Sequence, residues 1–125
     1  MEYKFRGFDA VGKKGWVYGD LVHNKKVTKT GLEDRVMVGG YEVVPESVGL
    51  FTGVENKSGI EIYEGDIVRY IFSTSDERHN HANAVVKWDF ARFVYHIPSP
   101  FINLPLDRPF EVVGNIFENK DLLKL

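Results

Sequence analysis

The sequence predicts an all-β fold, and three observations support this class. Aromatic residues make up 14% of the 125 residues, and their rings fit a half-buried pleated sheet better than a helix. Twelve Gly and five Pro supply turns between short runs. No segment before Asn119 keeps apolar residues at the helical spacing of about 3.6 residues over ten or more positions.

Short apolar or alternating runs bounded by turn-forming residues give the predicted strands. In chain order these are residues 3–6, 16–22, 35–38, 41–44, 60–63, 67–72, 84–88, 92–97 and 110–117. Residues 3–6 alternate apolar and basic side chains, which is the period of a half-buried strand. The Gly-Lys-Lys-Gly sequence at residues 12–15 then turns the chain, so the N-terminal part is predicted to open with a β-hairpin.

Glycine and proline mark the next elements. Gly39 and Gly40 separate two β-rich runs, and hairpin turns of this kind need the positive φ that glycine adopts freely. Pro45 ends the second run because proline supplies no N–H for a ladder bond. The polar stretch between the two hairpins, residues 23–34, is predicted to be a loop or a weak edge strand.

The C-terminal half alternates strands with polar breaks. Residues 56–59 and 64–66 are turn signals on either side of a short strand. Residues 84–88 and 92–97 are predicted to pair around a turn at Asp89.

Three segments of this half are predicted to lie outside the sheet. Residues 73–83 are polar except for one alanine and read as a loop. Prolines mark residues 98–109 as an irregular connection, and Asn119 is placed to cap a short C-terminal helix over residues 120–125.

Composition limits the chemistry and the location. The chain has no Cys, which excludes disulfides, zinc–thiolate sites and thiol catalysis and agrees with a reducing cytoplasm. The first residues hold no signal-like apolar segment, and no apolar run approaches the roughly 20 residues that cross a bilayer. We therefore expect a cytoplasmic protein that does not bind membranes. The net charge of −2 gives no overall attraction to phosphate.

Three segments, spread over nearly the whole chain, carry recognisable motifs. They are Lys4-Phe5-Arg6 with Asp9; residues 48–53 with Lys57, Gly59 and residues 61–68; and residues 112–119 with Leu122 and Leu123. In this order and spacing they resemble the YopX family of phage and prophage proteins. The chain has Asn56 where family members often have Asp, and either residue suits a turn.

The resemblance implies a fold but no activity. The length suits a single domain over residues 1–125, or two half-size lobes that share one core, and the resemblance implies an SH3-type C-terminal half. The first lobe, residues 1–55, would hold the N-terminal β-hairpins, and the second, residues 56–125, a small SH3-like barrel. The family motifs carry no assigned catalytic or binding residues, so no site is transferred to this chain.

The first hairpin is a candidate nucleic-acid surface. Lys4 and Arg6, with Trp16 and Tyr18, could supply phosphate contacts and rings on which bases stack. Because side chains alternate along a strand, Lys4 and Arg6 point away from the rings that flank Lys4 in the sequence. That favours an ordinary sheet with rings inside and cations outside.

Two further clusters are candidate metal or acid–base sites. Glu61, Glu64 and Asp66 could bind a cation, but Gly65 between them favours a turn that the Asp66 side chain stabilises. The second cluster lies in the polar loop and consists of Asp76, Glu77, His79 and His81. These are ligand types for zinc, but they can chelate only if the loop folds around the ion.

The hypothesis that the sequence favours is a non-enzymatic phage accessory protein that binds another protein, of host or phage origin. It needs no cofactor, and homo-oligomerisation is a further expectation because the edges of a small open sheet need covering. Nucleic-acid binding through the basic hairpin is the alternative. A metal-dependent enzyme using His79 and His81 is a third hypothesis.

Overall fold

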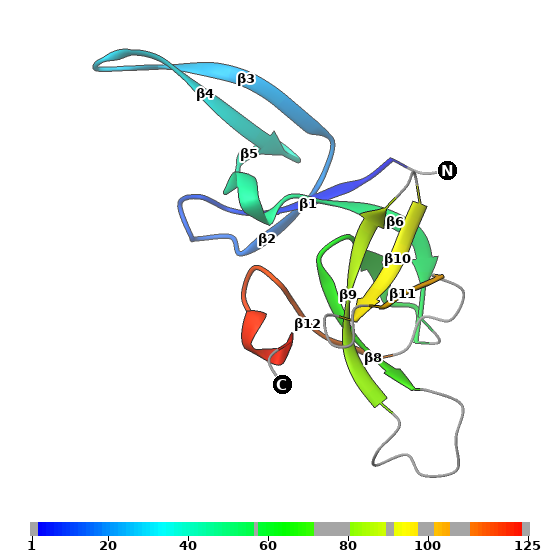
Figure 1. The fold of residues 1–125 in the computed structure, drawn as a ribbon. Helices are drawn as coiled ribbons and strands as arrows, with labels where there is room; N and C mark the ends of the chain where they lie inside the picture. The colour runs from blue at the N-terminus through cyan, green and yellow to red at the C-terminus, as the bar shows by residue number, and fades with distance from the viewer. Residues whose placement is uncertain are drawn as a thin grey trace. The chain divides into compact units, whose positions relative to one another are not determined.

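The structure is a computed structural model that describes residues 3–56, 58–71, 81–89, 92–97, 102–105 and 111–123. In these residues the chain forms twelve β-strands and two short 3₁₀ turns (Figure 1), which confirms the all-β class. It divides into two compact units, Met1–Phe51 and Thr52–Leu125, and each contains an apolar cluster of its own. No helix in the described part of the chain is long and apolar enough to span a membrane.

The first unit is built from antiparallel strands around a small valine core. Its elements are β1 (Phe5–Phe8), β2 (Trp16–Gly19), β3 (Leu21–Thr28), β4 (Gly31–Val38), β5 (Tyr41–Glu42), the 3₁₀ turn η1 (Pro45–Ser47) and the start of β6 (Gly49–Glu55). β1 pairs with β2 and with the first residues of β6, while β3, β4 and β5 form a three-stranded sheet. Val17, Val38 and Val43 are buried together and hold these pieces in one unit.

Two strands of the first unit differ from the sequence prediction. β1 begins later than expected and runs to Phe8, whose ring meets the Trp16 ring edge-on at 5.4 Å between centroids. β6 was not predicted as a strand, because its glycines and mixed side chains hide the alternation of apolar and polar residues.

The predicted strand over residues 16–22 is broken at Asp20. The chain bends there from β2 into β3, with a φ of 146° at Gly19. At this corner a Cβ on Gly19 would lie 2.8 Å from the Cα of Gly39, and the Gly39 N–H donates to the Asp20 carbonyl at 3.1 Å. The β2–β3 corner therefore crosses the β4–β5 turn with backbone against backbone.

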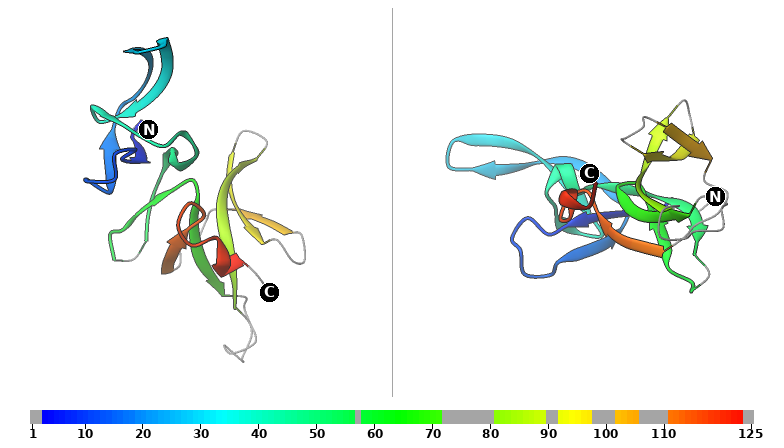
Figure 2. Two further views of the ribbon diagram at one scale, coloured as in Figure 1. Left: turned by 90° about the vertical axis from the view of Figure 1, so that its left-hand side faces the viewer. Right: turned by 60° about the horizontal axis from the view of Figure 1, so that its bottom comes forward.

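The polar stretch at residues 23–34 is an extended ribbon, so the loop interpretation was wrong and only the edge-strand interpretation holds for β3. β3 and β4 pair along their whole length, from Leu21 opposite Val38 to Thr28 opposite Gly31. β5 covers only the base of β4, at Met37 and Val38. Figures 1 and 2 show the outer part of the ribbon running clear of β1, β2 and β5.

The second unit is a five-stranded antiparallel sheet with β7 beside β6. Its elements are the rest of β6, β7 (Glu61–Tyr63), β8 (Asp66–Ile71), β9 (His81–Asp89), β10 (Arg92–Ile97), β11 (Ile102–Pro105), β12 (Glu111–Asn115) and the 3₁₀ turn η2 (Lys120–Leu123). The sheet order is β11-β10-β9-β8-β12. Ile62, Val68 and Tyr95 are buried at the centre of its core. The SH3-like barrel and the lobe boundary at residue 55 stay predictions.

The predicted pairing around Asp89 is confirmed, since β9 and β10 run antiparallel from Arg92 opposite Asp89 to His96 opposite Val85. Within the predicted loop, residues 81–83 belong to β9 because the end of β8 offers them a partner. Residues 72–80 lie outside the described residues.

Two further segments differ from the prediction. The irregular connection contains a strand, β11, which pairs with β10. Of the predicted C-terminal helix, the described residues form a single 3₁₀ turn, Lys120–Leu123. The Asn119 side chain accepts the N–H of Asn115 at 3.2 Å, so it closes the end of β12 in addition to standing before that turn.

The Gly39-Gly40 turn is confirmed, with φ of 59° and 87°, and it allows a matched stability test. Ala at Gly40 meets open space, so Gly40→Ala should cost only backbone strain, about 1–2 kcal/mol. Ala at Gly39 meets the Tyr18 carbonyl as well, so Gly39→Ala should cost about 1–3 kcal/mol more. Urea unfolding of both variants measures the difference. Equal urea midpoints for the two variants would show that the β2–β3 corner is not tightly packed against the β4–β5 turn.

Candidate functional site

The acidic cluster of the second unit holds a turn. A carboxylate oxygen of Asp66, which is buried, accepts the backbone N–H of Tyr63 at 2.8 Å. The Tyr63 hydroxyl donates to Glu61 at 3.1 Å. These contacts agree with the turn interpretation of this cluster. Among the described residues, no three His, Asp or Glu side chains are arranged to hold a metal ion.

Other motif residues also stabilise turns. The carboxylate of Asp9 accepts the N–H groups of Val11 at 3.0 Å and Lys14 at 3.1 Å, which fixes the turn after β1. The Asn115 side chain accepts the N–H of Glu118 at 2.9 Å in the turn after β12. The motif residues Asp9 and Asn115 therefore stabilise the fold by holding turns.

The histidine cluster cannot be assembled from the described residues. Asp76, Glu77 and His79 lie outside them, and only the backbone of His81 is described, at the start of β9. Metal binding by this segment stays a prediction.

The structure brings the proposed nucleic-acid residues onto one face of the β1–β2 hairpin. The register pairs Arg6 with Tyr18, and the Arg6 guanidinium lies 4.7 Å from the centroid of the Trp16 ring. Lys4 sits 5.1 Å from the centroid of the Phe51 ring. Phe5 packs on the valine core, on the face away from Lys4 and Arg6, as the alternation predicts. The expectation that cations lie outside and rings inside fails for Arg6, which is buried, and for Tyr18, which is exposed on the same face, because cross-strand register also decides which side chains share a face.

Burial nevertheless limits what this face offers. Arg6 is only 8% exposed, and Phe51 is buried, whereas Tyr18 is exposed. A guanidinium packed on a ring in this way contributes to stability through cation–π contact and burial of its stem. Arg6 therefore stabilises the fold and is not placed to contact a ligand.

The β3–β4 ribbon presents a free backbone edge that the sequence did not indicate. The Val36 carbonyl accepts the Val43 N–H at 3.0 Å and so points away from β3. His23 stands opposite Val36, so in an antiparallel ladder its own N–H and C=O point away from β4. The same alternation turns the backbone groups of Lys25 and Val27 outward. Within the described residues no strand pairs with this edge.

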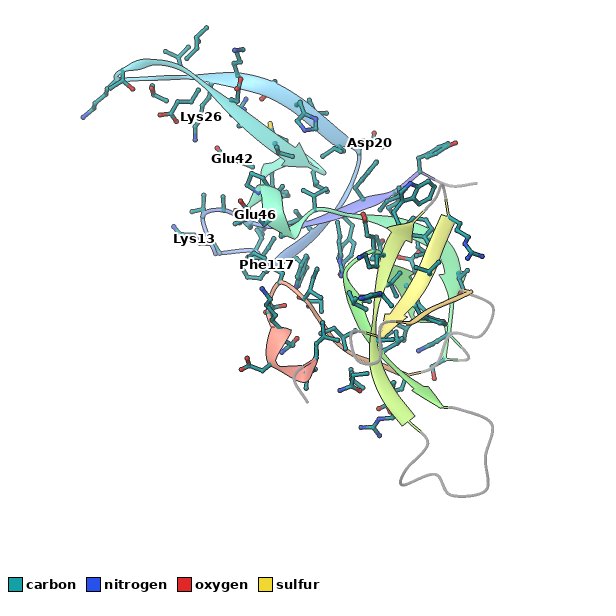
Figure 3. All side chains as sticks on the ribbon, viewed as in Figure 1. Lys13, Asp20, Lys26, Glu42, Glu46 and Phe117 are labelled. Atoms are coloured by element: carbon teal, nitrogen blue, oxygen red, sulfur yellow. The ribbon has the colours of Figure 1, made fainter. Side chains whose placement is uncertain are left out.

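Polar pairs across the strands hold the ribbon. Lys26 bonds both carboxylate oxygens of Glu42 on β5, at 2.9 and 3.0 Å, and Figure 3 shows the two side chains facing each other. Lys25 lies 3.2 Å from Asp34, its neighbour opposite on β4. At the tip, the Thr28 hydroxyl donates to the Gly31 carbonyl at 3.0 Å.

The ribbon also carries an exposed apolar pair at its tip. Val27 and Leu32 stand opposite each other and are 84% and 66% exposed. Nearer the base, a groove of about 420 Å³ lies along the ribbon. It is lined by His23, Asn24, Lys25, Asp34, Arg35, Val36 and Pro45. The free edge, the apolar tip and the groove make the ribbon the candidate functional site.

The structural role of Arg6 gives a testable stability difference. Arg6→Ala removes a buried side chain that packs on Trp16 and should lower the free energy of unfolding by about 1–2 kcal/mol. Lys13→Ala removes an exposed cation and should change it by less than about 0.5 kcal/mol. Urea denaturation of the two variants checks this. An Arg6→Ala variant as stable as the parent would show that the packing of Arg6 on Trp16 does not stabilise the fold.

Comparison with known proteins shows what this fold is similar to. A crystal structure of protein EF1440 from Enterococcus faecalis is similar to the chain with a TM-score of 0.59 and 22% identity, over 99% of this chain and 99% of that chain. At this identity the likeness concerns the fold alone. No curated protein matches the chain. The model of the family described as YopX protein matches residues 4–124. Because this match spans nearly the whole chain, the chain belongs to the YopX family.

Proposed function

We propose that this chain is a non-enzymatic accessory protein of phage or prophage origin, acting in the bacterial cytoplasm by binding another protein. The observation that carries the proposal is the apolar pair Val27 and Leu32 at the tip of the ribbon. Both side chains are held on a paired backbone and lie mostly in solvent.

Burial in a partner would release substantial free energy at this pair. Fully burying a Val or Leu side chain is worth about 1.5–3 kcal/mol, and Val27 and Leu32 keep most of their surface exposed. The competing explanation is that the pair stabilises its own hairpin. Cross-strand pairs contribute about 0.2–1 kcal/mol, which is less than burial against a partner offers.

The rest of the ribbon also suits a protein partner. A two-stranded hairpin by itself is marginally stable in water, and the outer half of this ribbon has no third strand among the described residues. A partner that covered the tip and paired with the edge would supply the missing burial. A second copy of this chain that covered the tip would be the homo-oligomer version of this proposal.

Nucleic-acid binding is the second candidate, and the shared face of Arg6, Trp16 and Tyr18 favours it. Against it stand the burial of Arg6 and the net charge of −2. It requires an affinity that falls steeply with salt, because phosphate contacts release counterions.

A paired-variant capture experiment tests the protein-binding proposal. The double variant Val27→Ser and Leu32→Ser should lose a protein that the parent chain captures from host lysate in near-stoichiometric amount. Val11→Ser is the matched control, because Val11 is 70% exposed but lies in the turn after β1. The control should retain the captured protein.

Nuclease treatment separates the two candidates. Capture that survives nuclease and depends on Val27 and Leu32 supports a protein partner at the ribbon tip. Capture that disappears with nuclease, or that the double variant retains in full, contradicts it.

A further inference from the structure

The edge of β3 has backbone groups ready for another strand. The N–H and C=O of His23, Lys25 and Val27 point away from β4, as the register and the Val36–Val43 bond require. Within the described part of the chain, the backbone N–H and C=O groups of these three residues form no hydrogen bond with another backbone group. Such an edge is a template for strand addition, in which main-chain bonds give affinity and alternate side chains give specificity.

The edge is basic. β3, Leu21–Thr28, contains His23, Lys25 and Lys26 and no acidic residue. The carboxylates that pair with the two lysines belong to β4 and β5, on the side away from the free edge. A strand added outside β3 would therefore meet cations first, and opposite charges on facing strands stabilise such a pair.

A second copy of β3 fits this edge poorly. Symmetric antiparallel pairing centred on Lys25 places Lys25 opposite its own copy. Pairing centred on Lys26 places Lys26 opposite its own copy. Like charges directly opposite each other destabilise a sheet, and lysines on edge strands are a common device against self-pairing.

These observations, taken together with the proposed function on which this step rests, point to the occupant of the edge. We infer that β3 binds an extended acidic segment of the partner protein, which adds as a further strand along His23, Lys25 and Val27. Its carboxylates, at alternate positions, would all lie on one face of the sheet, the face that carries Lys25.

A synthetic strand tests the inference directly. The probe is an end-capped peptide as long as β3, 8 residues, with glutamate and valine alternating. A second peptide has lysine in place of glutamate. Fluorescence anisotropy with the full chain should show the glutamate peptide binding at least about tenfold more tightly than the lysine peptide, and more weakly as salt is raised.

Backbone methylation separates strand addition from simple charge attraction. One peptide carries N-methyl groups on two residues that are separated by a single residue, so that both methyl groups lie on the same edge. Its other edge can still pair, and binding should persist. Two N-methyl groups on adjacent residues block both edges and should weaken binding at least about tenfold. Equal affinity of the two methylated peptides would overturn the inference.

A charge reversal on the protein has a matched control. Lys25→Glu should weaken binding of the glutamate peptide about tenfold, because an attractive cross-strand pair between Lys25 and a peptide glutamate becomes repulsive. Lys13→Glu makes the same charge change at an exposed position in the turn after β1 and should change the affinity less than about twofold.

Failure of this inference is distinguishable from failure of the proposed function. No peptide binding at about 1 mM, or sedimentation showing that the free chain self-associates through β3, overturns strand addition by an acidic segment. If Val27 and Leu32 are still needed for protein capture in that case, protein binding at the ribbon tip stands. If capture also fails, both are rejected.

Discussion

The ribbon depends on the backbone crossing at its base, where Gly19 of the β2–β3 corner meets Gly39 of the β4–β5 turn. A Cβ at Gly19 would lie 2.8 Å from the Gly39 Cα. A side chain at Gly19 would therefore keep the β2–β3 corner and the β4–β5 turn from approaching this closely. The crossing brings Val17 and Val38 into one core, and from that core the ribbon extends. Without it, the β3–β4 ribbon would be supported only by the short strand β5 at its base, and a hairpin with so little support is marginal in water.

Beyond that base the ribbon has two solvated faces, and this condition explains both its composition and its proposed role. With no core to bury, cross-strand pairs such as Lys25 with Asp34 and the bond from Lys26 to Glu42 hold it together. The exposed pair of Lys25 with Asp34 is worth little for stability. Neither pair involves the outward backbone groups of β3 or the apolar tip, which remain available for a partner. The side chains of the motif residues Asp9 and Asp66, by contrast, accept backbone hydrogen bonds that stabilise turns.

Sequence patterns predicted the elements that have a buried face or a distinctive turn. The Gly39-Gly40 hairpin and the pairing around Asp89 were found because glycine and apolar alternation leave clear signals. The ribbon over residues 23–34 was missed as a hairpin because a strand solvated on both faces shows no apolar period, and its turn lacks an Asn-Gly signal. The sequence therefore points to Arg6, which is buried, and not to the free edge, because that edge lies in a polar stretch that resembles a loop.

The central claim, an open edge on β3, is tested most directly by residue-resolved amide hydrogen exchange of the free chain. The amides of His23 and Lys25 should exchange rapidly, and those of Asn24 and Lys26, which point toward β4, should be protected. Equal protection of all four amides would show that another segment or another copy already covers this edge.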